Sequence, residues 1–130
     1  MKRTLNSITN MNMRQIFEGM SNKEFALACI NLLKEHKKLT EQVLDILTNQ
    51  KECNDRFNCS GFPVLKQVPR DCNKKELREL CHSGAKLRYY QERIEVNGYA
   101  FVVTNHWYGR NMSMPDNRTP FLEWVISLIS

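Results

Sequence analysis

The sequence has no run of about 20 apolar residues, the length that a membrane-spanning helix needs. It opens with Met1-Lys2-Arg3, and no apolar segment of the signal-peptide kind follows these residues. We therefore expect a cytoplasmic protein that makes no contact with a membrane. In that compartment the five cysteines are expected to be reduced thiols or metal ligands rather than disulfides.

The motifs of common catalytic sites are also missing. The sequence has no phosphate-binding loop, no dinucleotide-binding glycine pattern, no H-E-x-x-H and no paired carboxylates. Cys81 and His82 are adjacent, about 100° apart around a helix, so they cannot easily face each other as nucleophile and base. We expect a protein that is not an enzyme.

Cysteine pairs of the C-x-x-C kind are absent too, although four cysteines lie in or beside residues 51–72. These four are Cys53, Cys59, Cys72 and Cys81. Thiolates on such a segment can hold zinc, but the C-x-x-C spacing is what usually brings two sulfurs onto one tetrahedral ion. Buried cysteine is also common as a small hydrophobic side chain. We expect no cofactor, and zinc on these cysteines is the alternative.

What the chain does contain is the composition of a globular domain. Of its 130 residues, 42% are hydrophobic and 25% are charged, a balance that argues against disorder. We predict one α+β domain over residues 1–130. Helices are expected in residues 1–50, an irregular cysteine-containing loop in 51–72, a helix and an antiparallel β-hairpin in 73–108, and a last helix in 119–130.

Several predicted helices begin at residues that cap helix N-termini. Ser21 with Glu24, and Asn73 with Glu76, have the spacing of capping boxes. Thr40 can cap a separate helix, so we predict two helices rather than one between residues 21 and 49.

A β-hairpin is predicted around Asn97-Gly98, because a type I′ turn needs positive φ at both central residues. Pairing outward from the turn makes one mostly apolar face: Val96 opposite Tyr99, Ile94 opposite Phe101, Glu92 opposite Val103 and Tyr90 opposite Asn105. The more polar face holds Glu95 opposite Ala100, Arg93 opposite Val102, Gln91 opposite Thr104 and Tyr89 opposite His106. We expect the first face to be buried and the second to be exposed. A third strand is expected at about residues 62–68, since an isolated two-stranded ribbon is marginal.

A helix followed by a hairpin over residues 73–108 resembles, in outline, a winged helix-turn-helix. The resemblance implies that the helix capped by Asn73 contacts a groove of DNA. In that fold a preceding helix joins the recognition helix through a short turn. Here the preceding predicted helix ends near Asn49, more than twenty residues earlier.

Positive charge is concentrated in the same region. The net charge is +5, and residues 66–94 hold 8 basic and 4 acidic groups. We predict that the helix, which we expect to end at Gly84, and the ribbon bind nucleic acid, either DNA or RNA. Basic side chains neutralise phosphates, and an exposed tyrosine stacks on bases. The residues expected to do this are Lys74, Lys75, Arg78, Lys86, Tyr89 and Arg93.

The last helix is predicted to begin at Thr119, with Pro120 in its first turn. It is apolar on two sides, and Leu122, Ile126 and Ile129 form one of its stripes. We expect these residues to be buried within the domain; the alternative is an interface with a protein partner or a second copy. On that alternative the chain is an inhibitor or assembly subunit of the phage or mobile-element type.

Overall fold

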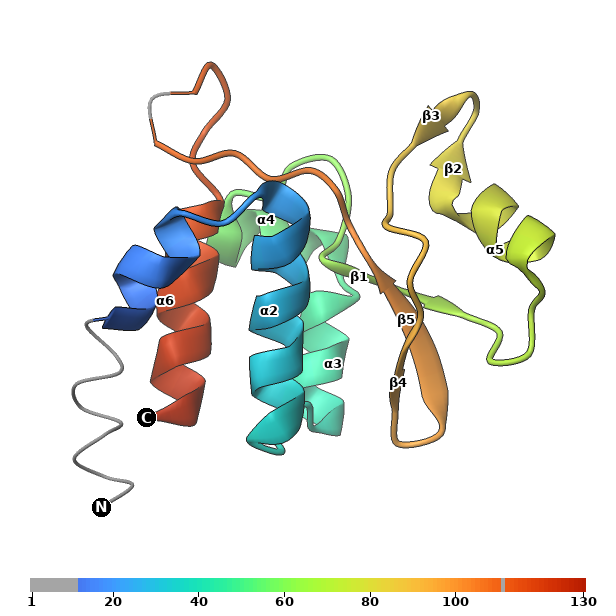
Figure 1. Cartoon of the computed structure of the whole chain (residues 1–130), viewed down its shortest axis with the longest axis horizontal. Coiled ribbons are helices and arrows are strands. Elements are labelled where there is room, and N and C mark those ends of the chain that lie inside the picture. The colour runs from blue at the N-terminus through green and yellow to red at the C-terminus, as the bar shows by residue number, and fades with distance from the viewer. Residues whose placement is uncertain (1–11, 111) are drawn as a thin grey trace.

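The computed structural model describes residues 12–110 and 112–130 and has the predicted α+β class (Figure 1). A short helix over residues 12–18 comes first. The elements that follow are α2 (Asn22–Glu35), α3 (Glu41–Leu47), α4 (Gln50–Phe57), β1 (Leu65–Val68), α5 (Lys74–Cys81), β2 (His82–Ser83), β3 (Lys86–Leu87), β4 (Ile94–Val96), β5 (Tyr99–Val103) and α6 (Arg118–Ile129).

Helices α2, α3, α4 and α6 form a helical body around a cluster of aromatic rings. The ring of Trp107 lies 5.4 Å from that of Phe25 on α2 and 5.0 Å from that of Phe121 on α6, between centroids. All three side chains are buried, and the Trp107 indole N–H donates to the Thr104 carbonyl at 2.7 Å. The polar atom of this large ring is therefore satisfied, and its burial stabilises the body.

A three-stranded antiparallel sheet, in the order β1-β5-β4, stands beside the helical body (Figure 1). The three pairs between β4 and β5 follow the predicted register. The turn residues Asn97 and Gly98 have φ of 52° and 85°, as a type I′ turn requires. The predicted third strand is confirmed as β1, which places Leu65 opposite Val103.

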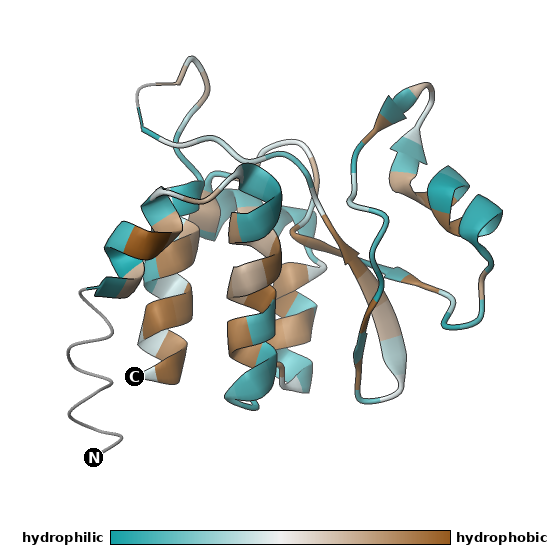
Figure 2. Ribbon diagram, viewed as in Figure 1, coloured by the Kyte–Doolittle hydropathy of each residue, from teal (hydrophilic) through white to brown (hydrophobic). Residues whose placement is uncertain are grey.

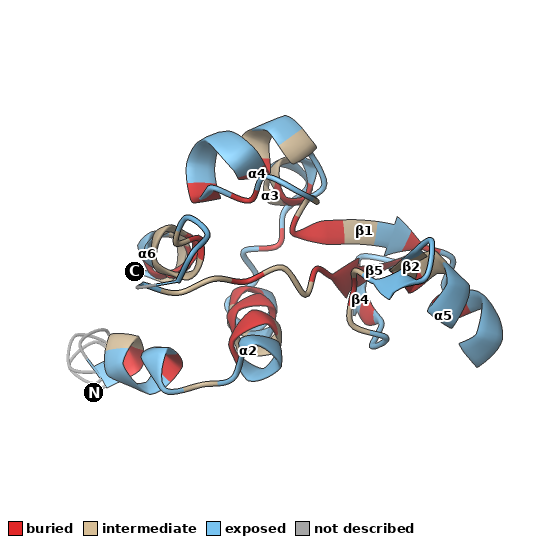
Figure 3. Ribbon diagram, turned by 90° about the horizontal axis from the view of Figure 1, so that it is seen from above, coloured by how far each residue is buried: buried red, intermediate tan, exposed pale blue. Residues whose placement is uncertain are grey.

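The sheet separates two hydrophobic clusters, because alternate residues of a strand point to opposite faces. Phe101 and Val103 belong to the cluster of the helical body, whereas Ala100 and Val102 belong to a second cluster. This second cluster joins the sheet to a small lobe that contains α5, on the side away from the helices (Figures 1 and 3). Figure 2 shows apolar residues along α2, α6 and β5 and mostly hydrophilic ones on α5. The prediction that the second face of the hairpin is exposed is therefore wrong for Tyr89 and for the β5 side, where Ala100, Val102 and Thr104 are buried. It is confirmed for Gln91, Arg93 and Glu95, which are exposed.

Capping hydrogen bonds confirm the predicted N-termini of three helices. Ser21 Oγ accepts from the Glu24 N–H at 3.2 Å, and the Glu24 carboxylate accepts from the Ser21 N–H at 3.1 Å. Asn73 and Glu76 form the same reciprocal pair at 2.8 and 3.1 Å. Thr40 caps α3, so two helices lie between residues 21 and 49, as predicted.

The prediction of an irregular loop over residues 51–72 is wrong for its first part, which is α4. The Asn49 side chain caps this helix by accepting from the Glu52 N–H at 2.9 Å, and Asn58, at φ 63°, ends it. Cys53 and Phe57 attach the helix to the body as fully buried side chains. Polar residues such as those of α4 favour loops in isolation, but a cap and a buried stripe stabilise the helix.

The predicted hairpin register holds near the turn and fails beyond Ile94. Tyr89 pairs with Thr104 and not with His106. Residues 91–93 lie outside the ladder, and the chain resumes pairing two residues out of step. A tight turn determines pairing only in its own neighbourhood, so the outer pairs depend on the packing around them.

Two helix boundaries also differ from prediction. Helix α5 ends at Cys81, and Gly84, at φ 63°, lies instead in the turn of the short hairpin β2–β3. Helix α6 begins at Arg118, and the Thr119 N–H is capped by the Asp116 carboxylate at 3.0 Å. Thr119 is therefore not the N-cap.

The resemblance to a winged helix-turn-helix does not extend to the arrangement in space. Strand β1 lies between α4 and α5, so these helices are not joined by a short turn. The hairpin that follows α5 directly is β2–β3, and the Asn97-Gly98 hairpin belongs to the central sheet.

Candidate nucleic-acid interface

The predicted basic helix lies in the lobe beyond the sheet, which we define as residues 69–88 and call the α5 lobe (Figure 1). Leu77 and Cys81 of α5 are buried against the cluster that includes Val102 of β5. These two residues are four positions apart and so lie on one face of the helix. The other face of α5 is left to charged residues, which Figure 3 shows as exposed.

Arg93 holds the α5 lobe against the sheet. Its Nη1 donates to the carbonyl oxygens of Arg70 at 2.6 Å and Cys72 at 2.8 Å. These bonds tie the loop before α5 to the residue that precedes β4. The sequence predicts a phosphate contact for Arg93, and the residue is exposed. Because its Nη1 is bound to these two carbonyls, we assign Arg93 first to positioning the lobe.

The C-terminal end of α5 is supported by two further side chains. Lys66 of β1 donates from Nζ to the Leu80 carbonyl at 2.7 Å, and His82 Nδ1 donates to the Arg78 carbonyl at 2.6 Å. The last carbonyls of a helix lack intrahelical partners and carry partial negative charge, so a cation is favourable there. The helix is therefore held at both ends, since Asn73 caps its start.

Four of the predicted phosphate contacts are exposed in the α5 lobe: Lys74, Lys75, Arg78 and Lys86. Within the described ranges, none of these four forms an ion pair. Lys75 and Arg78 line a shallow hollow between α5 and the turn of β2–β3, together with His82. Glu79 lines the same hollow and partly offsets its positive charge.

Tyr89 is buried, and the prediction that it lies on an exposed face is wrong. Its exposed fraction is 4%, and burial raises the pKa of its hydroxyl to about 12. Its ring meets that of Phe62 edge-on, with 5.9 Å between centroids, and the Lys66 ammonium lies 5.6 Å from its centroid. A tyrosine in this position cannot stack on a base.

Arg88 and His106 form a polar contact where the α5 lobe rejoins the sheet. Arg88 Nη1 donates to His106 Nε2 at 3.0 Å, and the guanidinium lies 5.2 Å from the centroid of the Phe62 ring. Because arginine only donates, His106 accepts at Nε2 and carries its proton on Nδ1. Burial and the charge of Arg88 lower the pKa of His106, so the imidazole is neutral at pH 7. Arg88 therefore has a structural role in joining the α5 lobe to the sheet.

The four candidate zinc ligands are divided between the two hydrophobic clusters. Cys53 and Cys59 lie in the cluster of the helical body, and Cys72 and Cys81 lie in that of the α5 lobe. All four are buried. In the described part of the chain, no three cysteine, histidine or acidic side chains are placed to share a metal ion. The structure therefore does not bring the four side chains together at one point.

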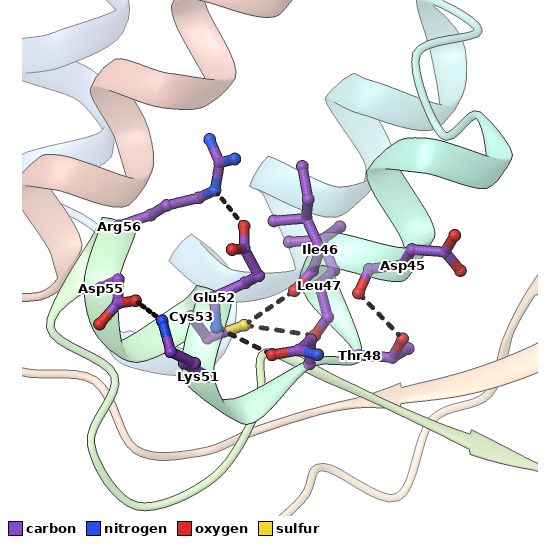
Figure 4. Close-up of polar contacts among 10 residues, drawn as sticks. Asp45, Ile46, Leu47, Thr48, Lys51, Glu52, Cys53, Asp55 and Arg56 are labelled. Atoms are coloured by element: carbon purple, nitrogen blue, oxygen red, sulfur yellow. Dashed lines mark hydrogen bonds and ion pairs between the residues drawn. The ribbon is translucent and has the colours of Figure 1, made fainter.

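The cysteine environments suit neutral thiols. The Cys53 thiol donates toward the carbonyl oxygens of Ile46 and Leu47 at 3.3 and 3.4 Å (Figure 4). Burial raises the pKa of Cys53 and raises that of Cys59 to about 12. Thiols that remain protonated are poor nucleophiles and poor metal ligands.

The apolar stripe of α6 faces the protein's own core. Leu122 and Ile126 are buried among the residues of the helical body, and Ile129 packs against the same cluster while partly exposed. The expectation of burial within the domain is therefore met for Leu122 and Ile126. Neither side chain is available to a partner, so the alternative interface lacks two of its three residues.

Sequence reasoning missed Lys66, Glu79 and His82 as parts of this region. Nothing in the sequence signals Lys66, because its contacts with Leu80 and Tyr89 join segments that are distant in the chain. For Glu79 a signal was present: it lies four residues after Lys75 and one after Arg78, where a helix brings the side chains together.

Comparisons with protein-family models, with curated proteins and with solved structures produce no match. Among the helices that the structure describes, none has the length and apolar character needed to cross a membrane. The physical properties of the α5 lobe are therefore the basis for a functional hypothesis.

Proposed function

We propose that this is a non-enzymatic, cytoplasmic protein that binds nucleic acid through the phosphate backbone. The observation that carries the proposal is the set of exposed basic side chains on α5 and β3 that have no ion-pair partner among the described residues. Unpaired cations on a rigid surface attract polyanions and release their counterions. The buried thiols fit a reducing compartment.

The distribution of charge supports the same proposal. The α5 lobe has six Lys or Arg residues and three Asp or Glu residues, so its formal charge is +3 within a protein of net charge +5. Arg88 of this set is used in the contact with His106. Arg70 is also exposed but lies in the loop before α5. The phosphate contacts are assigned to the exposed basic side chains of α5 and β3, which are Lys74, Lys75, Arg78 and Lys86.

The test is a titration of labelled DNA and RNA at several salt concentrations between about 50 and 200 mM. Four phosphate contacts predict that log affinity falls with log salt with a slope of about −3 to −4. In the double variant K75Q/R78Q the slope should shrink by about two and binding should weaken for all sequences alike.

The matched control is K34Q/K38Q, which removes the same charge from two exposed lysines at the far end of α2. It should bind as the parent protein does. If neither DNA nor RNA binds even at the lowest salt, or if K34Q/K38Q weakens binding as much as K75Q/R78Q, the α5 lobe is not a nucleic-acid interface.

A further inference from the structure

We infer that the ligand of the α5 lobe is the paired backbone of a double-stranded nucleic acid, bound without regard to sequence. The inference rests on the proposed function and adds to it the class of nucleic acid. Two observations support it. The surface of the lobe carries basic side chains but no Phe, Tyr or Trp ring, and the elements that carry the basic side chains are held in place by contacts with the rest of the protein.

The first observation is that the α5 lobe has no Phe, Tyr or Trp ring, and its one aromatic side chain is the partly exposed imidazole of His82. The adjoining Tyr89 is buried. The ring of Phe62, which is partly buried, contacts the Arg88 guanidinium and the ring of His106, 5.0 Å away between ring centroids. Tyr99 is 55% exposed, but it lies at the turn of β4–β5, at the opposite end of the sheet from the β2–β3 turn (Figure 1).

Stacking on aromatic side chains is what gives single-stranded binding proteins their affinity for unpaired bases. A surface without such rings has only charge to offer. A duplex presents one phosphate charge per about 1.7 Å of its axis, and each neutralised phosphate releases more counterion than in a single strand, about 0.9 against 0.7. Charge alone therefore favours the duplex.

The second observation is that the basic groups are carried by fixed elements. Helix α5 is capped by Asn73 and supported at its end by Lys66, and Arg93 ties the preceding loop to the sheet. A rigid array keeps its spacing when it binds, so it fits a stiff duplex at little entropic cost. A flexible single strand must be ordered on the same array, and that ordering weakens its binding.

The side chains of the lobe also explain the absence of base reading. Asn and Gln, which pair with adenine in the major groove, are represented in residues 69–88 only by Asn73, and its side chain is occupied in the α5 cap. Arg70 and Arg78 are the exposed side chains whose forked geometry can also read guanine, whereas the exposed lysines act as point charges toward phosphates. Contacts of this kind position a protein on a backbone and carry no sequence information.

The experiment compares the full chain on four kinds of labelled probe of about 20 nucleotides or base pairs: duplex DNA, duplex RNA and the corresponding single strands, each in two unrelated base sequences, at one low salt concentration. We expect at least tenfold tighter binding to a duplex than to its own single strands, and equal affinity for duplexes of unrelated sequence. The DNA and RNA arms show which duplex is bound.

A second variant tests the role of stacking directly. A85W places an aromatic ring on the exposed turn of β2–β3, beside the hollow. It should raise the affinity for single strands several-fold and narrow the preference for the duplex. The variant K75Q/R78Q, which lacks two positive charges, should bind the duplex probes more weakly than the parent protein does.

Single strands bound as tightly as duplexes would overturn this inference and leave the proposed function standing. A duplex preference that depends on one base sequence would overturn its sequence-independent part. Failure to bind any of the probes would overturn the proposed function itself.

Discussion

The contact between Arg88 and His106 determines the protonation state of the histidine. The arginine is always charged, so the 3.0 Å contact requires an imidazole that accepts at Nε2. A protonated His106 would lose that acceptor and place two positive charges together. The contact joins the end of the α5 lobe to the chain leaving β5, where the Asn105 N–H also donates to the Arg88 carbonyl at 2.9 Å.

This pair predicts a pH dependence of stability. The pKa of His106 is lowered in the folded protein by burial and by Arg88, whereas in the unfolded chain it has its ordinary value of about 6.5. Below that pH the unfolded chain binds a proton that the folded protein excludes. The free energy of unfolding should therefore fall as the pH is lowered from about 7.5 through 6.5 and into the range of the folded pKa.

Urea unfolding of the parent protein and of H106Q across this range measures the effect. Glutamine does not titrate, so the free energy of unfolding of H106Q should depend less on pH, and its stability relative to the parent should rise toward the acidic end. H36Q removes an exposed histidine from the end of α2, away from the Arg88 contact, and is the control for the loss of a histidine. Parallel curves for the parent and H106Q would contradict the prediction.

At the scale of elements, α5 depends on the sheet for its place. An isolated helix of eight residues is not stable in water, so tertiary packing must hold it. Leu77 is the α5 side chain that, with Cys81, packs into the cluster shared with Val102. The α5 lobe is therefore expected to be the part of the molecule that opens first.

L77A tests this expectation. Removing a buried leucine side chain usually costs about 2 to 5 kcal/mol, and at this partly enclosed site we expect a value near the lower end. Hydrogen exchange should accelerate in α5 and β2–β3 while the amides of α2 and α6 remain protected, and nucleic-acid affinity should fall. L33A removes a fully buried side chain near the C-terminal end of α2 and should accelerate exchange everywhere. Equal acceleration in both variants would show that the lobe and the body open together.

At the scale of the whole molecule, the position of a charge matters more than the net charge. Glu79 lies in the hollow with Lys75 and Arg78, and no hydrogen bond or ion pair of its side chain is seen in the described part of the chain. Its carboxylate repels the same phosphates that the neighbouring cations attract. Its removal should therefore improve binding with little effect on the fold.

E79Q should tighten binding to nucleic acid by about two- to fivefold, which corresponds to the roughly 0.5–1 kcal/mol of an exposed charge pair. E35Q raises the net charge by the same amount at the end of α2 and should change affinity little. The comparison is made at one low salt concentration, because added salt screens both effects. An equal gain from E35Q would mean that overall charge, and not the α5 lobe, governs binding.

Several features of this protein were predictable because the interactions behind them are short in sequence. The capping boxes at Ser21 and Asn73 each span four residues, and the Asn97-Gly98 turn determines its own φ angles and nearest pairs. The α+β class and the third strand follow from the same local patterns. The exposure of the basic residues of α5 was predictable, because a helix with a hydrophobic stripe buries that stripe and exposes the opposite face.

The remaining features depend on which distant segments pack together. The α5 lobe covers the second face of the sheet, so Tyr89 is buried in it, and Arg93 bonds to carbonyls more than twenty residues earlier in the chain. Packing on opposite faces of the same sheet separates Cys53 from Cys81. A strand pattern states that two faces differ, but whether the second face meets water or another element is set by the topology of the whole chain.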